Sequence, residues 1–391
     1  MKRYKLKDLS ISKLEYGSGA AACEYDGNTR YVRITDIDSD GKLGDDIVSP
    51  NNVDEKYILN DGDVLFARTG ATVGKTYRYH KEDGRCLYAG FLIRVIPNQK
   101  IIRPDYLYYF TKSPQYNSFV QSSMKVVAQP NINAKQYGDL EFNVPELVVQ
   151  DEIIEKLSKI VRVIDARKQE LLKLDELIKS RFVELFGDPA TNEKGFIKAP
   201  MGDYMTLLTD FSSNGSYKTL DSGVTMYDEP NFAWMVRTTD LESGDMTANK
   251  YIDEKAYELL AKSKIYGGEI IMNKIGSAGK IYLMPQIDMP ASLGRNAFMF
   301  RYDERINVKF LYHLLTSEYG QREIQQYVRG AVTKTITKND ARAVLIIVPP
   351  IELQNEFEAF VGQVDKSKVV VQKALDEAQL LFDSLMQKYF G

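Results

Sequence analysis

Two diverged copies of one unit make up the chain, and this internal repeat constrains the fold more than any other feature of the sequence. A shift of 204 residues, the separation between Phe186 and Phe390, places the second half on the first. The match runs without a gap over positions 144–186 and 348–390. A repeat of this length predicts two structural units of one architecture rather than a single core.

Shorter matched blocks lie nearer the start of each copy. The Val-Arg and Thr-Asp pairs at 32–36 match those at 236–240, and we expect their Arg and Asp to pair structurally. Shifts of 205 or 206, as small loop insertions produce, relate Gly62, Gly70, Gly74 and Lys75 to Gly268, Gly276, Gly279 and Lys280. Aromatic residues at helical spacing are expected in the cores: Tyr106, Tyr108, Tyr109, Phe110, Phe310 and Tyr312.

Each copy has the same internal order, a region that mixes strand-like and helical patterns followed by a long periodic segment that ends at glycine. The fold class is therefore expected to be α/β (α+β). The predicted division is a first mixed domain at 1–147, a long helix at 148–187, a linker at 188–200, a second mixed domain at 201–351 and a second long helix at 352–391.

The long segments carry apolar residues at alternating steps of three and four, which is a heptad seam. The predicted seam residues are Ile153, Leu157, Ile160, Ile164, Leu171 and Leu174 in the first helix, and Phe357, Val361, Val364, Val371, Leu375 and Phe382 in the second. From the repeat we expect an antiparallel coiled coil with pseudo-twofold symmetry. The alternative is that each stripe packs on its own domain, because Arg167, Arg181 and Lys368 interrupt it.

Composition excludes several classes of protein. With 44% hydrophobic and 27% charged residues, the chain has the composition of a folded globular protein. Two cysteines and two histidines are too few for a zinc site or a histidine-based catalytic triad, so no metal and no catalytic residues are expected. The basic start of the chain is followed by no apolar stretch, which predicts a cytoplasmic protein.

The net charge of −3 counts against strong binding of nucleic acid by the chain alone, because phosphate neutralisation needs an excess of cations at the contact surface. Any DNA recognition must therefore depend on local basic loops or on partners.

A glycine loop at 68–76 almost matches a phosphate-binding P-loop, but only three residues separate Gly70 from Gly74. Its repeat at 274–281 is shorter still, so nucleotide hydrolysis is not expected. Two interpretations of the loop remain: a phosphate contact through backbone N–H groups and the lysine, or a tight hairpin with a solvated lysine.

Polar segments at 125–135 and 329–342 precede the long helices in both copies. Their amides, hydroxyls and cations are the side chains that contact bases and phosphates, although such a segment alone is more often a turn. Together with the glycine loops, they supply the predicted DNA-binding residues: Thr69, Thr72, Lys75, Arg78, Lys125, Asn131, Asn133 and Lys135, and Lys274, Ser277, Lys280, Arg329, Lys334, Thr335 and Lys338.

Four short blocks occur in the same order in each half, and the resemblance that they carry extends over essentially the whole chain. They are the Val-Arg-Ile-Thr-Asp-Ile block at 32–37, the Gly-Asp-Val-Leu block at 62–65, the Pro-Asn-Ile-Asn segment at 130–133, and Val-Pro at 144–145 leading into Gln-Asp-Glu at 150–152. In this arrangement the chain resembles the specificity (S) subunits of type I restriction-modification systems.

The resemblance implies a non-catalytic subunit that recognises DNA. The complex to which it belongs would methylate DNA and would defend the cell by cutting phage DNA. Two target-recognition domains would each read half of a bipartite, asymmetric site in double-stranded DNA, while the helices set the spacing and dock two methyltransferase subunits and the restriction subunits. S-adenosylmethionine, ATP and Mg²⁺ would be bound by those partners. The alternatives are a related bipartite system that cuts both sides of its site, or a coiled-coil scaffold that binds proteins.

Overall fold

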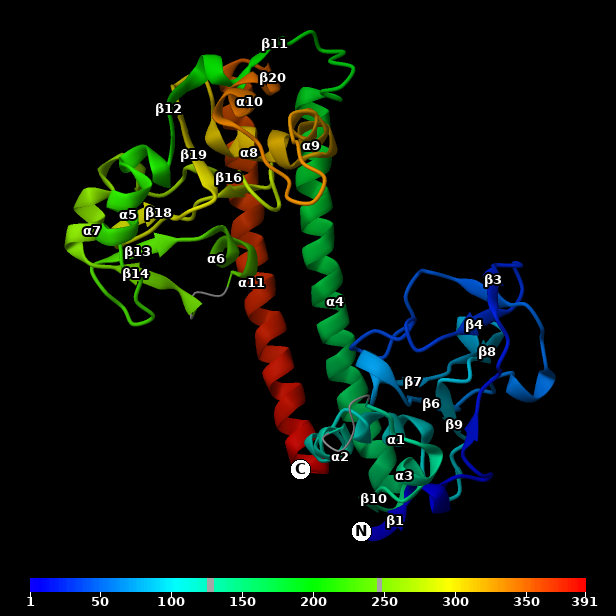
Figure 1. Ribbon diagram of the computed structural model, residues 1–391. Helices are drawn as coiled ribbons and strands as arrows, with labels where there is room; N and C mark the ends of the chain where they lie inside the picture. Colours follow the sequence, from blue (N-terminus) through cyan, green and yellow to red (C-terminus); the bar gives the residue numbers. More distant parts are fainter. Residues whose placement is uncertain (125–129, 245–247) are drawn as a thin grey trace. The chain divides into compact units, whose positions relative to one another are not determined.

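The chain forms two compact units. The computed structural model describes residues 1–124, 130–244 and 248–391. The first unit contains Met1–Glu170 and Val371–Gly391, and the second contains Leu171–Val370 (Figure 1). Each unit therefore combines one mixed domain with a part of each long helix, and the predicted functional boundaries inside that arrangement stay a prediction.

The main sheet of the first domain has four antiparallel strands in the order β2 (Glu15–Tyr16), β9 (Leu92–Val95), β6 (Val64–Ala67) and β7 (Thr76–Arg78). Three two-stranded sheets complete it: β3 (Ala22–Glu24) with β5 (Val48–Pro50), β4 (Arg30–Val32) with β8 (Cys86–Tyr88), and β1 (Lys2–Lys5) with β10 (Glu141–Val144).

Three helices cover the main sheet of the first domain: α1 (Pro104–Phe110), α2 (Pro114–Met124) and α3 (Ala134–Gly138). Their aromatic residues fill the core, where Phe110 stacks on Phe142 of β10 with ring centroids 3.8 Å apart. Tyr106, Tyr109 and Phe110 are buried as predicted, whereas Tyr108 is half-buried and donates through its hydroxyl to the carbonyl of Asp40.

The second domain repeats this frame. Its main antiparallel sheet has the order β12 (Met205–Asp210), β19 (Ala297–Tyr302), β16 (Ile270–Asn273) and β17 (Ile281–Leu283). A further sheet has the order β14 (Lys250–Ile252), β13 (Ala233–Val236), β18 (Ala291–Leu293) and β15 (Lys264–Ile265), and β11 (Ile197–Pro200) pairs with β20 (Leu345–Val348). The helices are α5 (Tyr217–Gly223), α6 (Thr238–Ser243), α7 (Glu254–Leu259), α8 (Val308–Thr316), α9 (Glu318–Gln325) and α10 (Lys338–Ala343).

Strand pairing confirms the predicted repeat. The first strand of each domain pairs with the strand before the long helix, with Lys2 opposite Val144 and Ile197 opposite Val348. Both domains also contain one parallel pair at the equivalent place, β4 with β8 and β13 with β18. The predicted Arg–Asp pairs are confirmed too, at 2.7 Å between Arg33 and Asp36 and 2.5 Å between Arg237 and Asp240.

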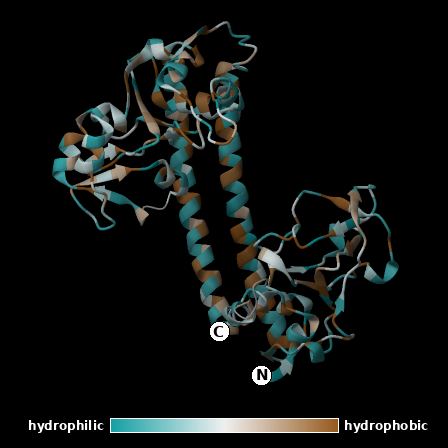
Figure 2. Ribbon diagram, in the orientation of Figure 1, coloured by the Kyte–Doolittle hydropathy of each residue, from teal (hydrophilic) through white to brown (hydrophobic). Residues whose placement is uncertain are grey.

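Two long helices, α4 (Leu147–Phe186) and α11 (Ile351–Phe390), have 40 residues each and would each extend roughly 60 Å. Figure 2 shows apolar and polar residues alternating along both. Within the first unit the start of α4 shares a core with the end of α11, and within the second unit the end of α4 shares a core with the start of α11. The helices therefore pack antiparallel, as predicted. None of the helices in the described ranges has an apolar stretch long enough to cross a bilayer.

The seam differs from a strict heptad at the helix ends. Of the predicted seam residues, Ile153, Leu157, Ile164, Phe357, Val361, Val364 and Val371 are buried, and Ile160, Leu171, Leu174, Leu375 and Phe382 are half-buried. Near the C-terminal ends the buried residues Phe182, Phe186, Met386 and Phe390 each lie one position beyond 181, 185, 385 and 389, where steps of three and four continue the predicted seam. An α-helix repeats every 3.6 residues and drifts about 20° per heptad from a 3.5 repeat, which moves the buried face.

The polar residues that interrupt the stripe meet the other helix in two of three cases. Arg181 pairs with Glu356 and Lys368 with Asp175, both at 2.5 Å. Arg167 pairs with Glu170 on its own helix. The start of each helix also packs on its own domain, as Ile153 and Leu157 do beside Phe142. The coiled coil and the packing of each stripe on its domain are therefore both present.

A buried glutamine joins each domain to the start of its long helix. The Gln150 side chain accepts from the backbone N of Arg103 and donates to the carbonyls of Ile101 and Pro145, each at 2.8 Å. The Gln354 side chain makes the same three hydrogen bonds, to Asn307 N and to the carbonyls of Arg305 and Pro349. Both glutamines are 0% exposed, so these bonds fix the direction in which each helix leaves its domain.

Candidate nucleic-acid interface

The glycine loops connect antiparallel strands. The first joins β6 to β7, and the second joins β16 to β17. Gly74 and Gly279 have φ angles of 84° and 87°, and a Cβ at either would lie within 2.6 Å of a side chain on α2 or α9. Only glycine fits such a position. Because a P-loop connects a strand to a helix, this strand–loop–strand geometry agrees with the rejection of a nucleotide site.

Each glycine loop lies against the polar segment that was predicted separately from it. Residues Thr69 and Asn131 form an isolated β-bridge, and Ile275 forms the equivalent bridge with Thr335. The backbone N of Ile132 donates to the carbonyl of Arg68, and that of Ile336 to the carbonyl of Lys274. The structure therefore brings the two candidate segments of each copy together.

A third loop completes the arrangement at the same end of each main sheet. The backbone N of Arg68 donates to the carbonyl of Phe91 in the β8–β9 turn, and that of Lys274 donates to the carbonyl of Asn296 in the β18–β19 turn. We call the described residues at 68–75, 89–91 and 130–135 the first loop cluster, and those at 274–280, 294–296 and 329–338 the second loop cluster. Both have the same backbone connections.

In the first loop cluster the predicted cations have different surroundings. Lys75 donates through Nζ to the carbonyl of Ile37 at 3.0 Å, and Lys135 is exposed and makes no ion pair with the described part of the chain. Arg78 is directed elsewhere, because it pairs with Asp61 and Asp105 and its side chain is only 11% exposed. Lys125 lies outside the described residues.

Several predicted hydrogen-bonding groups of both clusters are used within the fold. Asn133 caps α3 by accepting from the backbone N of Gln136, and Thr72 donates to the carbonyl of Thr69. In the second domain the backbone of Thr335 pairs with that of Arg329. Among the predicted polar residues, the Asn131 amide nitrogen and the hydroxyls of Thr69, Ser277 and Thr335 make no hydrogen bond to a described residue.

The cations of the second loop cluster are largely paired with carboxylates. Lys274 and Lys338 both contact Asp210, each at 2.8 Å, Lys280 pairs with Glu242 at 2.5 Å and Arg329 with Asp340 at 3.1 Å. Burial by itself would raise the pKa of Asp210, but hydrogen bonds from the two lysines and from Ser212 and Ser213 lower it far below its usual value. Lys334 is exposed and has no ion pair with a described residue.

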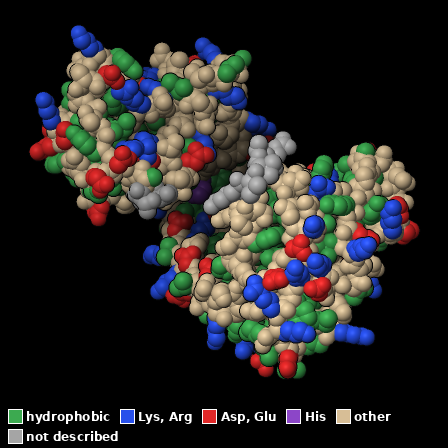
Figure 3. Space-filling model, turned by 60° about the horizontal axis from the view of Figure 1, so that its bottom comes forward, with side chains coloured by type: hydrophobic (Ala, Val, Ile, Leu, Met, Phe, Trp, Pro, Cys, Tyr) green, Lys and Arg blue, Asp and Glu red, His purple; other side chains and the backbone are tan. Residues whose placement is uncertain are grey.

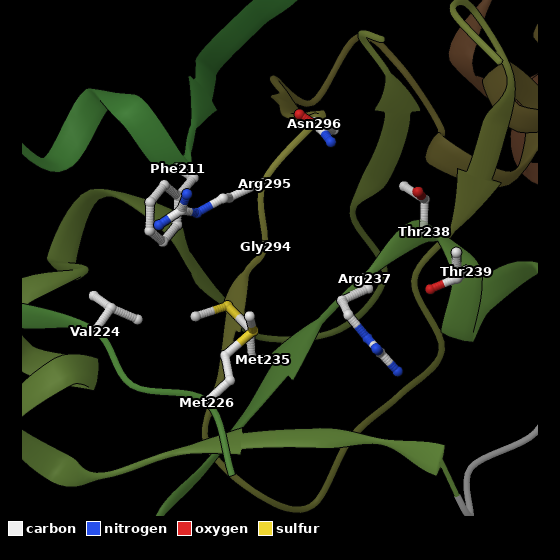
Figure 4. A pocket seen from close by; sticks show the side chains of 10 residues that line it. All are labelled: Phe211, Val224, Met226, Met235, Arg237, Thr238, Thr239, Gly294, Arg295 and Asn296. Atoms are coloured by element: carbon white, nitrogen blue, oxygen red, sulfur yellow. The ribbon is translucent and has the colours of Figure 1, made fainter. Parts of the chain in front are cut away.

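Two hollows adjoin the second loop cluster. One of about 440 Å³ is lined by three predicted residues, Ser277, Lys280 and Lys334, together with side chains of α8 and α9. The other, of about 340 Å³, is lined by the apolar residues Phe211, Val224, Met226 and Met235 and by the polar residues Arg237, Thr238, Thr239, Arg295 and Asn296, with the Arg295 guanidinium lying over the Phe211 ring (Figure 4).

Sequence reasoning missed Tyr16, Arg68 and Asp210. The Arg68 guanidinium lies over the Tyr16 ring at 4.7 Å from its centroid, and Tyr16 and Asp210 occupy equivalent positions beside β9 and β19. Their separation is 210 − 16 = 194 residues rather than 204. The repeat is therefore out of register at these strands, and only the sheet pairing relates them.

Charges of both signs are interspersed on the surface, as the face in Figure 3 shows.

Comparisons with known proteins agree with this architecture. Residues 2–176 match the family model described as "Type I restriction modification DNA specificity domain". The chain is 23% identical over 344 residues to the type I restriction enzyme MjaVIII specificity subunit of Methanocaldococcus jannaschii, covering 83% of this chain and 77% of that protein. It is 22% identical to the EcoBI specificity subunit of Escherichia coli, over 72% of this chain and 64% of that protein.

Solved structures show the same fold. The type I restriction-modification S subunit from M. genitalium superposes with a TM-score of 0.58 at 14% identity, covering all of this chain and 96% of that one. A chain from a structure of the assembly and conformational transition of the type I R-M system gives a TM-score of 0.57 at 16% identity, covering 100% and 97%.

Proposed function

Because the chain belongs to the family of type I restriction-modification specificity subunits, we propose that it recognises a bipartite DNA site, with each domain reading one half. The observation that carries this proposal is the repeated loop cluster. The same three loops meet at the same end of each main sheet, while their side chains differ. A repeated frame with diverged loops is suited to reading two unlike half-sites.

In this proposal the long helices set the spacing between the half-sites. They run antiparallel and each is fixed to its domain by a buried glutamine, so a change in helix length alters the distance between the readers. We also propose that a pseudo-twofold axis relates the two halves of the chain. Charged and polar outer faces of the helices would dock two methyltransferase subunits, and restriction subunits would join to cut DNA.

We assign the bond chemistry to those partners. Adenine methylation would use S-adenosylmethionine bound by the methyltransferase, which extrudes the base from the duplex, and ATP and Mg²⁺ would serve the restriction subunit. The complex would act in the cytoplasm, where the DNA is. Partner cations would also supply much of the phosphate grip, because most cations of the second loop cluster are already paired with carboxylates.

Mapping of methylated adenines tests the proposal. The chain is produced with its methyltransferase partner in a host that lacks other adenine methylation. We expect one asymmetric motif made of two read segments and an unread gap, and no methylation when either protein is omitted. A continuous motif would contradict reading by two domains, and cleavage on both sides of the site would indicate the related bipartite system instead.

The salt dependence of DNA binding tests the loop clusters. Lys135→Ala and Lys334→Ala remove exposed cations that have no ion pair with a described residue. If each contacts a phosphate, the slope of log K against log salt for the assembled complex falls by about 1 per lysine, for all DNA sequences alike. Lys100→Ala, at an exposed lysine outside both loop clusters and outside the long helices, is the matched control. Equal slopes for all variants would show that Lys135 and Lys334 do not contact phosphates.

A further inference from the structure

The backbone of Arg68 is fixed from both sides at the end of β6. Its N–H donates to the carbonyl of Phe91 at 3.1 Å, and its carbonyl accepts from the backbone N of Ile132 at 2.8 Å. These bonds connect it to both neighbouring loops of the first loop cluster. The Cα of Arg68 is therefore held as firmly as a residue inside the sheet, although the side chain is only half-buried.

The side chain of Arg68 is ordered as well. Its guanidinium lies over the Tyr16 ring, and its Nε donates to Oδ1 of Asn131 at 3.4 Å. Tyr16 is itself held, because its hydroxyl accepts from the backbone N of Ala134 at 3.1 Å. Nη1 and Nη2 of Arg68 have no partner among the described residues, and no described carboxylate pairs with this arginine. Both Nη groups, which lie in one plane with Nε, are therefore free of hydrogen bonds to the residues that the structure describes.

At the equivalent position in the second domain, the cation is already paired with a carboxylate. Lys274 follows β16 as Arg68 follows β6, but its Nζ contacts Asp210, which also holds Lys338. The side chain of Asp210 is 6% exposed and that of Lys274 is 18% exposed. A lysine held by a buried carboxylate presents no planar pair of donors, so the two domains cannot read a base in the same way at this point.

We infer that Arg68 forms a guanine-binding site in the first domain, with Tyr16 as the positioning residue that holds its plane. Guanine presents two acceptors in the major groove, N7 and O6, at the separation that an arginine fork matches. The Asn131 amide nitrogen lies beside this fork and would donate to the same or the adjacent base. This inference rests on the proposed function, since it requires that the first loop cluster faces the major groove.

Binding of the assembled complex to duplexes that contain 7-deazaguanine tests the inference, because this analogue lacks the N7 acceptor. Each guanine of the site is replaced in turn. For the unaltered complex we expect a loss of roughly 5-fold at one guanine. Arg68→Ala should weaken binding to the normal duplex by roughly 5- to 150-fold and should remove the further effect of 7-deazaguanine at that guanine.

Further variants separate base reading from folding and from charge. Arg68→Lys keeps the charge but not the fork, and we expect it to lose the dependence on 7-deazaguanine. Tyr16→Phe keeps the ring and should retain that dependence, whereas Tyr16→Leu should lose it without changing the salt slope. Lys135→Ala, in the same loop cluster, should weaken all duplexes alike.

The outcomes distinguish the two levels of the account. If the unaltered complex binds all duplexes equally, the proposed function itself is wrong. If it discriminates sequences but no guanine depends on Arg68, or if the half-site of the first domain contains no guanine, only the assignment of Arg68 is overturned.

Discussion

The two domains share a frame and differ in what that frame presents. In the first, Arg68 lies on Tyr16 and its two Nη groups make no hydrogen bond to a described residue, whereas in the second the equivalent Lys274 is paired with the buried Asp210. The backbone bonds around both residues are the same. Buried contacts that hold the frame have therefore been kept in both copies, while the side chains at the loop cluster have diverged.

The largest effect is expected where the two copies are alike. Gln150→Leu would leave a buried N–H and two carbonyls without partners and should lower the free energy of unfolding by about 3 kcal/mol. Gln354→Leu should cost the same, because its three bonds are equivalent. Denaturant unfolding of the purified chain measures both. Gln372→Leu, at an exposed glutamine of α11, should change stability by less than about 0.5 kcal/mol. If Gln150→Leu or Gln354→Leu changed stability as little as this control, the buried glutamines would not stabilise the two domains in the same way.

A smaller effect is expected where the copies differ. Asp210→Asn removes the carboxylate that two lysines share and should destabilise the second unit by about 2 kcal/mol, less than for a fully buried pair because the lysines are partly exposed. Tyr16→Phe, at the equivalent position, should cost less than about 1 kcal/mol.

The contribution of Asp210 to stability should depend on pH. Because the pKa of Asp210 is lowered in the folded state, its contribution is fully present above the unfolded value near 3.9 and is lost as the pH falls below it. Unfolding of Asp210→Asn at pH 7 and pH 3 should show less acid sensitivity than the unaltered chain. Equal acid sensitivity would show that the shared carboxylate contributes nothing.

A pH effect of similar size to that of Asp210→Asn concerns His313 of α8. Burial lowers its pKa to about 4, with Asp365, Lys368, Asp175 and Lys309 as the charged neighbours. An unfolded histidine titrates near 6.5, so the unfolded state gains a proton first and the second unit loses stability as the pH falls from 6.5 towards 4. From these two pKa values we expect the second unit to be about 2 kcal/mol less stable at pH 5 than at pH 7. The first copy has Tyr109 at this position, so His313→Tyr is the matched variant, and it should remove the difference.

Much of the fold could be predicted because periodic patterns in the sequence indicate both the repeat and the long helices. The repeat showed itself in gapless matches around Gln150 and Gln354, and the long helices in their apolar spacing. The burial of Phe186 and Phe390 at the helix ends departs from the predicted heptad, since a 3.6-residue period accumulates an offset that a local pattern does not reveal.

The loop clusters could be predicted only in part. The glycine loops and the polar segments were recognisable one by one, but their contact depends on pairing between distant residues such as Thr69 and Asn131. Tyr16 lies on a two-residue strand that carries no pattern of its own. Arg78 was a plausible phosphate contact by type, yet its position on β7 directs it to Asp61 and Asp105.

Exchange of one domain tests the central claim, that each domain reads its own half-site on a common frame. Residues 201–345 are replaced by the matching region of a relative, which leaves both long helices intact, and methylated adenines are mapped genome-wide. The account predicts that one half of the recognised sequence changes while the other half and the spacing stay the same. A change in both halves together would contradict it.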